Sequence, residues 1–164
     1  MATIFKSTQR DFKEAPNKID YFKIFTDVSI TGKNLKTQNL NFDLRQLHPG
    51  QYSAPYHSHR HAEELFMIIS GSATLRTPNG LEIVEAGDLM FFEMGETGAH
   101  QLYNHTTAPC TFLDVRTYIG HDVCDYPDSN KTLIAPTMEV FGKDSQVPYF
   151  EGEEHIRDVW EKLK

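Results

Sequence analysis

The chain has few cysteines. Only Cys110 and Cys124 occur among its 164 residues, and they stand outside any CxxC spacing. Two separate cysteines in a chain of this length do not make a disulfide framework. We therefore expect both to be reduced thiols, Cys110 in a strand and Cys124 in a loop.

Long apolar runs are also missing. No stretch approaches the roughly 18 apolar residues that a membrane-spanning helix needs, and residues 1–10 lack the apolar centre of a secretory signal. We expect a cytoplasmic protein that contacts no membrane.

Positive charge is scarce. The chain has 16 Lys and Arg against 23 Asp and Glu, a formal net charge of -7, and the charges are scattered along the sequence. No basic stripe exists that would neutralise a row of phosphates, and no segment has the length of a helix-turn-helix beside the strands. Nucleic acid is therefore not an expected partner.

Short apolar or alternating runs separated by turn residues dominate the chain, which is typical of antiparallel strands. We expect strands at residues 21–28, 40–47, 51–57, 64–69, 73–77, 81–84, 88–93, 100–104 and 111–117. Because no helical period lies between residues 40 and 117, βαβ units are excluded, and the fold class is an all-β antiparallel sandwich or barrel. With 39% hydrophobic residues, the chain is expected to form one domain over residues 1–164.

Two segments follow the expected strands. Residues 118–146 are rich in Asp, Pro, Ser and Asn and are too long for a simple connection, so they either wrap the barrel or form part of its mouth. Near the end of the chain, Ile156, Val159, Trp160 and Leu163 have the spacing of one helix face. This predicts a short C-terminal helix over 153–164 that packs on the barrel or on a partner subunit.

Histidines alternate with other residues just before an apolar strand. His57 and His59 share one face if they lie on a strand, about 7 Å apart, so both rings can reach one ion. His61 falls where the chain must turn and is assigned to a turn or to the surroundings of the site. Glu64 shares a strand face with Phe66, and an ionised carboxylate in such apolar surroundings is energetically costly. A divalent cation bound by the imidazoles and the carboxylate compensates this cost.

A second interpretation makes the same histidines solvent-facing residues of an edge strand, with Glu63 and Glu64 as its polar rim. The spacing of the surrounding residues favours the metal site. Four residues separate His59 from Glu64 and six separate Glu64 from Gly71, after an earlier Gly50. This arrangement resembles the first motif of the cupin superfamily.

The second cupin motif is matched by Gly87, Gly95, His100 and Asn104, and fifteen residues separate Gly71 from Gly87. The chain departs from the family pattern in having one more residue than usual before the first histidine, Glu93 in place of proline, and a longer loop before His100.

The resemblance implies a small single-domain bacterial cupin, a double-stranded β-helix or jelly-roll barrel with its core at about residues 40–117. It also implies that His57, His59, Glu64 and His100 bind one divalent transition metal. Asn104 is assigned a structural role, because such residues commonly bond their own backbone.

Several chemistries suit such a centre. Mn, Fe, Ni, Co and Zn all accept these ligands, and the sequence does not choose among them. A metal-dependent isomerase or epimerase acting on a small polar or carbohydrate-like molecule is one function, a dioxygenase is another, and a non-catalytic cupin that binds a small ligand is a third. A metal-free structural cupin ranks last, because all four ligand positions are filled.

Three residues near the motifs are weaker candidates for substrate binding: Tyr56, Arg45 and Tyr103. The resemblance also favours a homodimer, because cupins commonly pair through barrel edges and flanking segments. We expect the segments 21–28 and 153–164 to form its interface.

Overall fold

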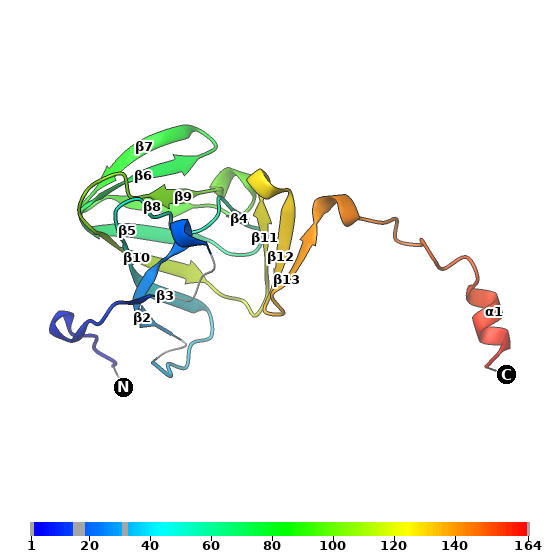
Figure 1. Cartoon of the computed structure of the whole chain (residues 1–164). Coiled ribbons are helices and arrows are strands. Elements are labelled where there is room, and N and C mark those ends of the chain that lie inside the picture. The colour runs from blue at the N-terminus through cyan, green and yellow to red at the C-terminus, as the bar shows by residue number, and fades with distance from the viewer. Residues whose placement is uncertain (1, 15–18, 31–32, 164) are drawn as a thin grey trace.

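The computed structural model describes residues 2–14, 19–30 and 33–163 and is built almost wholly from antiparallel strands (Figure 1). The largest sheet has the order β1-β2-β3-β10-β5-β8. Its strands are β1 (Lys13–Glu14), β2 (Phe25–Ser29), β3 (Leu40–Leu47), β10 (Cys110–Thr117), β5 (Glu64–Ser70) and β8 (Leu89–Phe92).

Two smaller sheets complete the barrel. One has the order β13-β12-β11-β4, the other β7-β6-β9. Their strands are β4 (Ser58–His59), β6 (Ser72–Thr77), β7 (Gly80–Glu85), β9 (Gln101–Tyr103), β11 (Asp122–Tyr126), β12 (Lys131–Ala135) and β13 (Glu139–Gly142). The helical elements are η1 (Ser7–Gln9), η2 (Asp20–Phe22), η3 (Glu96–Gly98), η4 (Pro127–Ser129), η5 (Lys143–Ser145) and α1 (Ile156–Glu161). The expected all-β jelly-roll class is confirmed.

The core lies between the large sheet and the smaller ones. In β5, Phe66 and Ile68 are buried while Met67 and Ile69 are exposed, as the alternation of strand faces predicts. Phe112 of β10 has no exposed surface and packs against Phe66, with ring centroids 5.0 Å apart. The inward face of β5 therefore runs from the apolar core to the buried Glu64 at one end of the strand.

The expected strand at 51–57 is wrong. Tyr52 and His57 form only isolated bridges, to Tyr103 and His100, and regular pairing begins at β4. Pro55 interrupts the segment, because a proline has no N–H to donate to a ladder.

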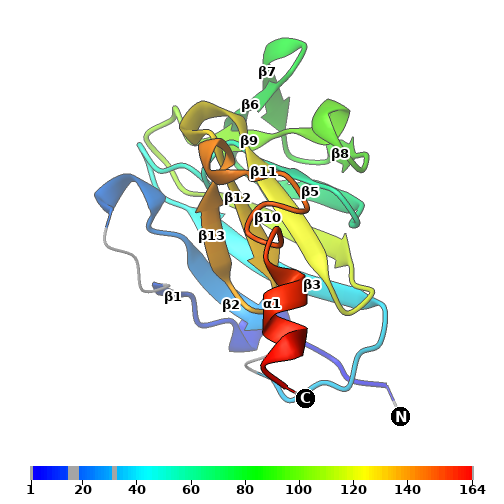
Figure 2. The same ribbon diagram turned by 90° about the vertical axis from the view of Figure 1, so that its right-hand side faces the viewer.

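The segment 118–146 forms strands rather than an irregular wrapper. Strand β11 pairs with β4, which carries His59, and β12 and β13 extend the sheet (Figure 2). Of the two alternatives for this segment, the mouth of the barrel is therefore correct. Cys124 lies in β11 and is buried, so its expected place in a loop is wrong.

The C-terminal helix is shorter than expected and does not pack on the barrel. It spans Ile156–Glu161 at the end of an extended segment that leaves the barrel (Figure 1). Trp160 is 65% exposed, as is expected of a helix with no partner within this chain. Among the described residues, no helix has the length and apolarity to cross a membrane.

The expected strand at 21–28 is also shorter. Residues 20–22 form η2, and β2 lies between β1 and β3, so it is not an edge strand open to a second subunit.

Candidate metal centre

Three separate parts of the barrel bring His57, His59 and Glu64 together, with ligand atoms all within 4.8 Å of one another, and place His100 beside Glu64. His59 belongs to β4, Glu64 begins β5, and His57 and His100 face each other across a backbone bridge. His59, Glu64 and His100 are buried, with exposures of 3%, 4% and 1%. The four residues predicted as metal ligands are thus adjacent in space.

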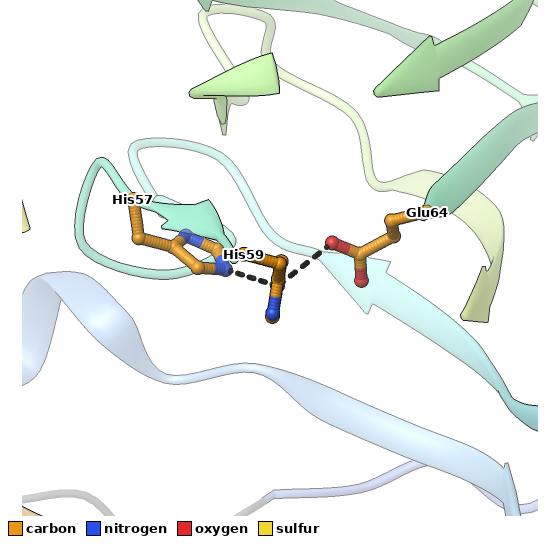
Figure 3. A group of neighbouring side chains, drawn as sticks. All are labelled: His57, His59 and Glu64. Atoms are coloured by element: carbon orange, nitrogen blue, oxygen red, sulfur yellow. Dashed lines mark hydrogen bonds and ion pairs between the residues drawn. The ribbon is translucent and has the colours of Figure 1, made fainter. Parts of the chain in front are cut away.

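The potential ligand atoms are close together. The Nε2 atoms of His57 and His59 are 3.1 Å apart, and Nε2 of His59 lies 3.2 Å from Oε2 of Glu64 (Figure 3). Nε2 of His100 lies 3.1 Å from the same carboxylate oxygen. These distances suit one ion, because two ligands at right angles, each about 2.1 Å from a metal, stand about 3.0 Å apart.

The other nitrogen of each ring is engaged with an acceptor. Nδ1 of His57 lies 2.9 Å from the Pro55 carbonyl, and Nδ1 of His100 lies 2.9 Å from the Gly98 carbonyl. Nδ1 of His59 lies 2.5 Å from Oδ2 of Asp122. A proton on each Nδ1 satisfies these acceptors and leaves the Nε2 lone pair for a metal.

Glu64 is held as the negative ligand of the group. Burial opposes its ionisation, but hydrogen bonds and charges from His100 and His59 outweigh burial and hold its pKa well below the usual range. The neighbouring carboxyl of Asp114 behaves oppositely, because burial and the Glu64 charge raise its pKa well above the usual range. The two neighbouring carboxyl groups therefore favour a single negative charge, carried by Glu64.

The site attracts positive charge. Burial and the neighbouring His100 and His59 lower the pKa of His57 to about 3. Burial also acts against a charge on His59, but hydrogen bonds to Asp122, Cys124 and Glu64 outweigh it and raise its pKa to about 11. Without a metal, a proton on His59 supplies the positive charge that this group of acceptors needs.

The four residues fit a divalent metal. Oε2 of Glu64 and Nε2 of His100 are buried and lack any hydrogen-bond partner of good geometry among the described residues. A metal bound to three neutral imidazoles and one carboxylate would satisfy both atoms and would supply Lewis-acid chemistry. The four residues would hold such an ion, and Pro55, Asp122 and Gly98 orient the imidazoles.

A second group of possible ligands shares one residue with the first. His59, Asp122 and Cys124 also have ligand atoms within 4.8 Å of one another. In this group Nδ1 of His59 already donates to Asp122, and the other Asp122 oxygen accepts from the His61 and Val123 backbone amides. Asp122 and Cys124 are therefore better placed to orient His59 than to bind an ion themselves.

A cavity of about 230 Å³ opens beside the candidate ligands. His57 and His59 line it, together with Asp122, Cys124 and Tyr126 from alternate positions of β11. The Tyr126 ring stacks on His57, with centroids 5.8 Å apart. Sequence reasoning missed these β11 residues, although the alternation of Asp122, Cys124 and Tyr126 is itself a strand signal.

The three residues predicted to bind substrate do not line this cavity. Arg45 is paired with Asp43 and Asp114, each at 3.0 Å, inside the barrel. Tyr56 is buried beneath the guanidinium of Arg76, 3.9 Å from its ring centre, and Tyr103 stacks on Tyr52 at 4.6 Å. These contacts occupy all three side chains.

Two neighbouring assignments are settled by their contacts. His61 donates its backbone N–H to Asp122 and its ring lies beside His121, so His61 lies in the surroundings of the site, as expected. The Asn104 amide donates to the Leu47 and Ala108 carbonyls at 2.8 Å, which confirms its structural role.

Residues 44–116 match the family model described as a cupin domain. This part of the chain is a cupin domain. The match includes both motifs and all four candidate ligands of the cupin site, and it ends at Arg116, before β11 begins.

Solved structures share the fold. A protein of Acidithiobacillus ferrooxidans, provisionally named a sugar phosphate isomerase, is 22% identical, with a TM-score of 0.75 over 88% of this chain and 95% of that one. A sugar phosphate isomerase of the cupin superfamily from Silicibacter pomeroyi is 20% identical, with a TM-score of 0.75 over 91% and 98%. An uncharacterised Klebsiella pneumoniae protein with a double-stranded β-helix domain is 22% identical, with a TM-score of 0.53 over 71% and 90%. No curated protein sequence matches the chain.

Proposed function

We propose that this protein is a metal-dependent isomerase or epimerase that acts on a small carbohydrate-like molecule. The observation that carries the proposal is that the ligand atoms of His57, His59 and Glu64 all lie within 4.8 Å of one another beside a small cavity. Nε2 of His100 lies 3.1 Å from Oε2 of Glu64 and adds a third imidazole. The names of two solved structures that share the fold over most of both chains support the same substrate class.

The donor set suits this chemistry. A divalent metal held by three neutral histidines and one carboxylate keeps a net positive charge and binds neighbouring oxygens of a hydroxy-carbonyl group. The protein residues would fix its position, since the imidazoles are oriented through their Nδ1 atoms and Glu64 is buried beside His59 and His100. The buried aromatic rings of Phe92 and Phe66 enclose His100 and exclude water from that side.

The metal is tested first. Protein purified without a metal-affinity column or chelator is analysed for bound transition metals by plasma mass spectrometry, and we expect about one ion per chain. His59→Ala should lose that ion, whereas His155→Ala, whose ring is 84% exposed in the C-terminal segment, should keep it. Full occupancy in His59→Ala contradicts the ligand set.

The reaction is tested next. The metal-loaded protein is incubated in deuterium oxide with aldose and ketose sugars and their phosphates, and nuclear magnetic resonance follows deuterium incorporation beside the carbonyl carbon. Incorporation supports an isomerase. Oxygen uptake instead, measured with an electrode, identifies the dioxygenase alternative, and binding with neither reaction identifies a ligand-binding cupin. The homodimer and the cytoplasmic location stay predictions.

A further inference from the structure

Arg116 stands out among the arginines of the barrel because no carboxylate of the described residues forms an ion pair with it, although Asp114 is near enough to interact with its charge. Arg45 pairs with Asp43 and Asp114, and Arg60 and Arg76 each pair with one aspartate. The Arg116 side chain makes no ion pair or hydrogen bond with any residue that the structure describes, although it is partly buried. A guanidinium removed from water without a partner is unfavourable, so its position calls for a ligand.

The register of the large sheet places Arg116 beside the candidate metal centre. In β10, Arg116 lies directly opposite Glu64 of β5. Directly opposed residues in antiparallel strands project from the same face, with Cβ atoms about 4.5–5.5 Å apart. The Arg116 side chain therefore leaves the sheet on the side of the four candidate ligands.

The cavity beside the histidines is lined by Arg116 as well. Asn41, Tyr118 and His121 contribute to the same lining. The carboxylates nearby have other partners. Asp122 accepts from His59, and Asp114 lies 3.0 Å from Arg45. Glu64 lies beside His59 and His100. The cavity thus joins the candidate metal site to a guanidinium that has no ion pair among the described residues, an arrangement that suits an anion.

We infer that Arg116 binds an oxyanion of the substrate, a phosphate or a carboxylate, while the sugar oxygens of the same molecule face the metal. The inference rests on the proposed function and narrows its substrate to an anionic carbohydrate. The planar guanidinium donates two parallel hydrogen bonds to either oxyanion. A cavity of about 230 Å³ is smaller than the roughly 300–1,000 Å³ of sites for drug-sized ligands, so the substrate is a small sugar derivative.

The test compares Arg116→Gln with a matched variant, Arg76→Gln, whose side chain pairs with Asp128 on the exposed surface. Isothermal titration calorimetry of the metal-loaded proteins measures the affinity for ribulose 5-phosphate, ribonate, ribulose, inorganic phosphate and acetate. Thermal melting and metal content are measured for both variants, so that loss of folding or metal is recognised.

We expect wild-type protein to prefer an anionic ligand, and Arg116→Gln to weaken that binding by about 10- to 100-fold, as for the loss of a charged hydrogen-bond partner. Arg76→Gln should bind as wild type does. A preference for ribulose 5-phosphate and phosphate identifies a phosphate site, and one for ribonate and acetate identifies a carboxylate site.

Failure of the proposed function and failure of this inference give different results. If no sugar derivative binds but phosphate or acetate binds wild type and not Arg116→Gln, the oxyanion site stands and the proposed sugar substrate is wrong. If Arg116→Gln, folded and metal-loaded, binds every anion as tightly as wild type does, the inference is overturned. The same holds if wild type binds none of the anions.

Discussion

Asp122→Asn gives the sharpest test of how the centre is held together. Asp122 uses both oxygens: Oδ2 accepts from Nδ1 of His59 at 2.5 Å, and Oδ1 accepts from the backbone amides of His61 and Val123 at 3.0 and 2.8 Å. Asparagine has nearly the same shape but offers one acceptor oxygen and one donor nitrogen. Either orientation of the amide therefore breaks part of this arrangement.

If the asparagine oxygen keeps the two backbone amides, its NH₂ group faces Nδ1 of His59. The ring must then accept at Nδ1 and carry its proton on Nε2, the atom that faces the metal position. If the amide is reversed, its NH₂ group faces two backbone donors and leaves them without an acceptor. We expect the first orientation, because it leaves fewer buried groups unpaired.

The expected result is a loss of metal affinity by about 10- to 100-fold, or about 1.4–2.7 kcal/mol, as for other carboxylates that orient a ligating histidine. Affinity is measured by competition with a fluorescent chelator. Asp128→Asn, the same change at an exposed carboxylate paired with Arg76, should leave affinity unchanged. Wild-type affinity in a folded Asp122→Asn protein would refute the orienting role of Asp122.

The remaining predictions use other parts of the molecule. Gly98→Ala should destabilise the fold by about 1–3 kcal/mol and lower metal content, because its Cβ would clash with the Glu93 carbonyl oxygen. Gly142→Ala should melt as wild type does, because the nearest atom to its Cβ, Ser145 Oγ, is 4.0 Å away. Metal binding at pH 7 should release about one proton, since the raised pKa of His59 keeps its ring protonated without a metal. Calorimetry in buffers of different ionisation enthalpy measures this proton release. A binding enthalpy that does not depend on the buffer contradicts the prediction. Apparent affinity should accordingly fall as the pH is lowered. Light scattering should find a dimer that becomes a monomer when the segment carrying α1 (Ile156–Glu161) is deleted; a monomeric full chain refutes the dimer.

The sequence predicted the barrel well where local patterns are sufficient. The alternation in β5 correctly placed Glu64 and Phe66 on the buried face and left Met67 outside. Such patterns depend only on the period of a strand and on turn residues. The motif spacing likewise selected four residues that the structure brings together, and their ligation of a metal stays a prediction.

What the sequence could not supply was long-range pairing. Arg45 was predicted to bind substrate because it lies near the motifs in sequence, but the register of β3 against β10 places it beside Asp114. No local pattern reveals this register. Cys124 was assigned to a loop because aspartates flank its short apolar run, and those aspartates are buried only because His59 and Arg60 pair with them.

The residues that distinguish this site lie at the end of the cupin match and beyond it. The family model ends at Arg116, whereas Asp122, Cys124 and Tyr126 come from β11. The two structures with a TM-score of 0.75 cover 88% and 91% of the chain, so their likeness extends past the residues that the family model matches, while the Klebsiella pneumoniae structure covers 71%. The four candidate ligands alone suit many cupin chemistries. We therefore expect the end of β10 and β11 to determine the choice of substrate, and changes there should alter specificity while the metal stays bound, provided that Asp122 is kept.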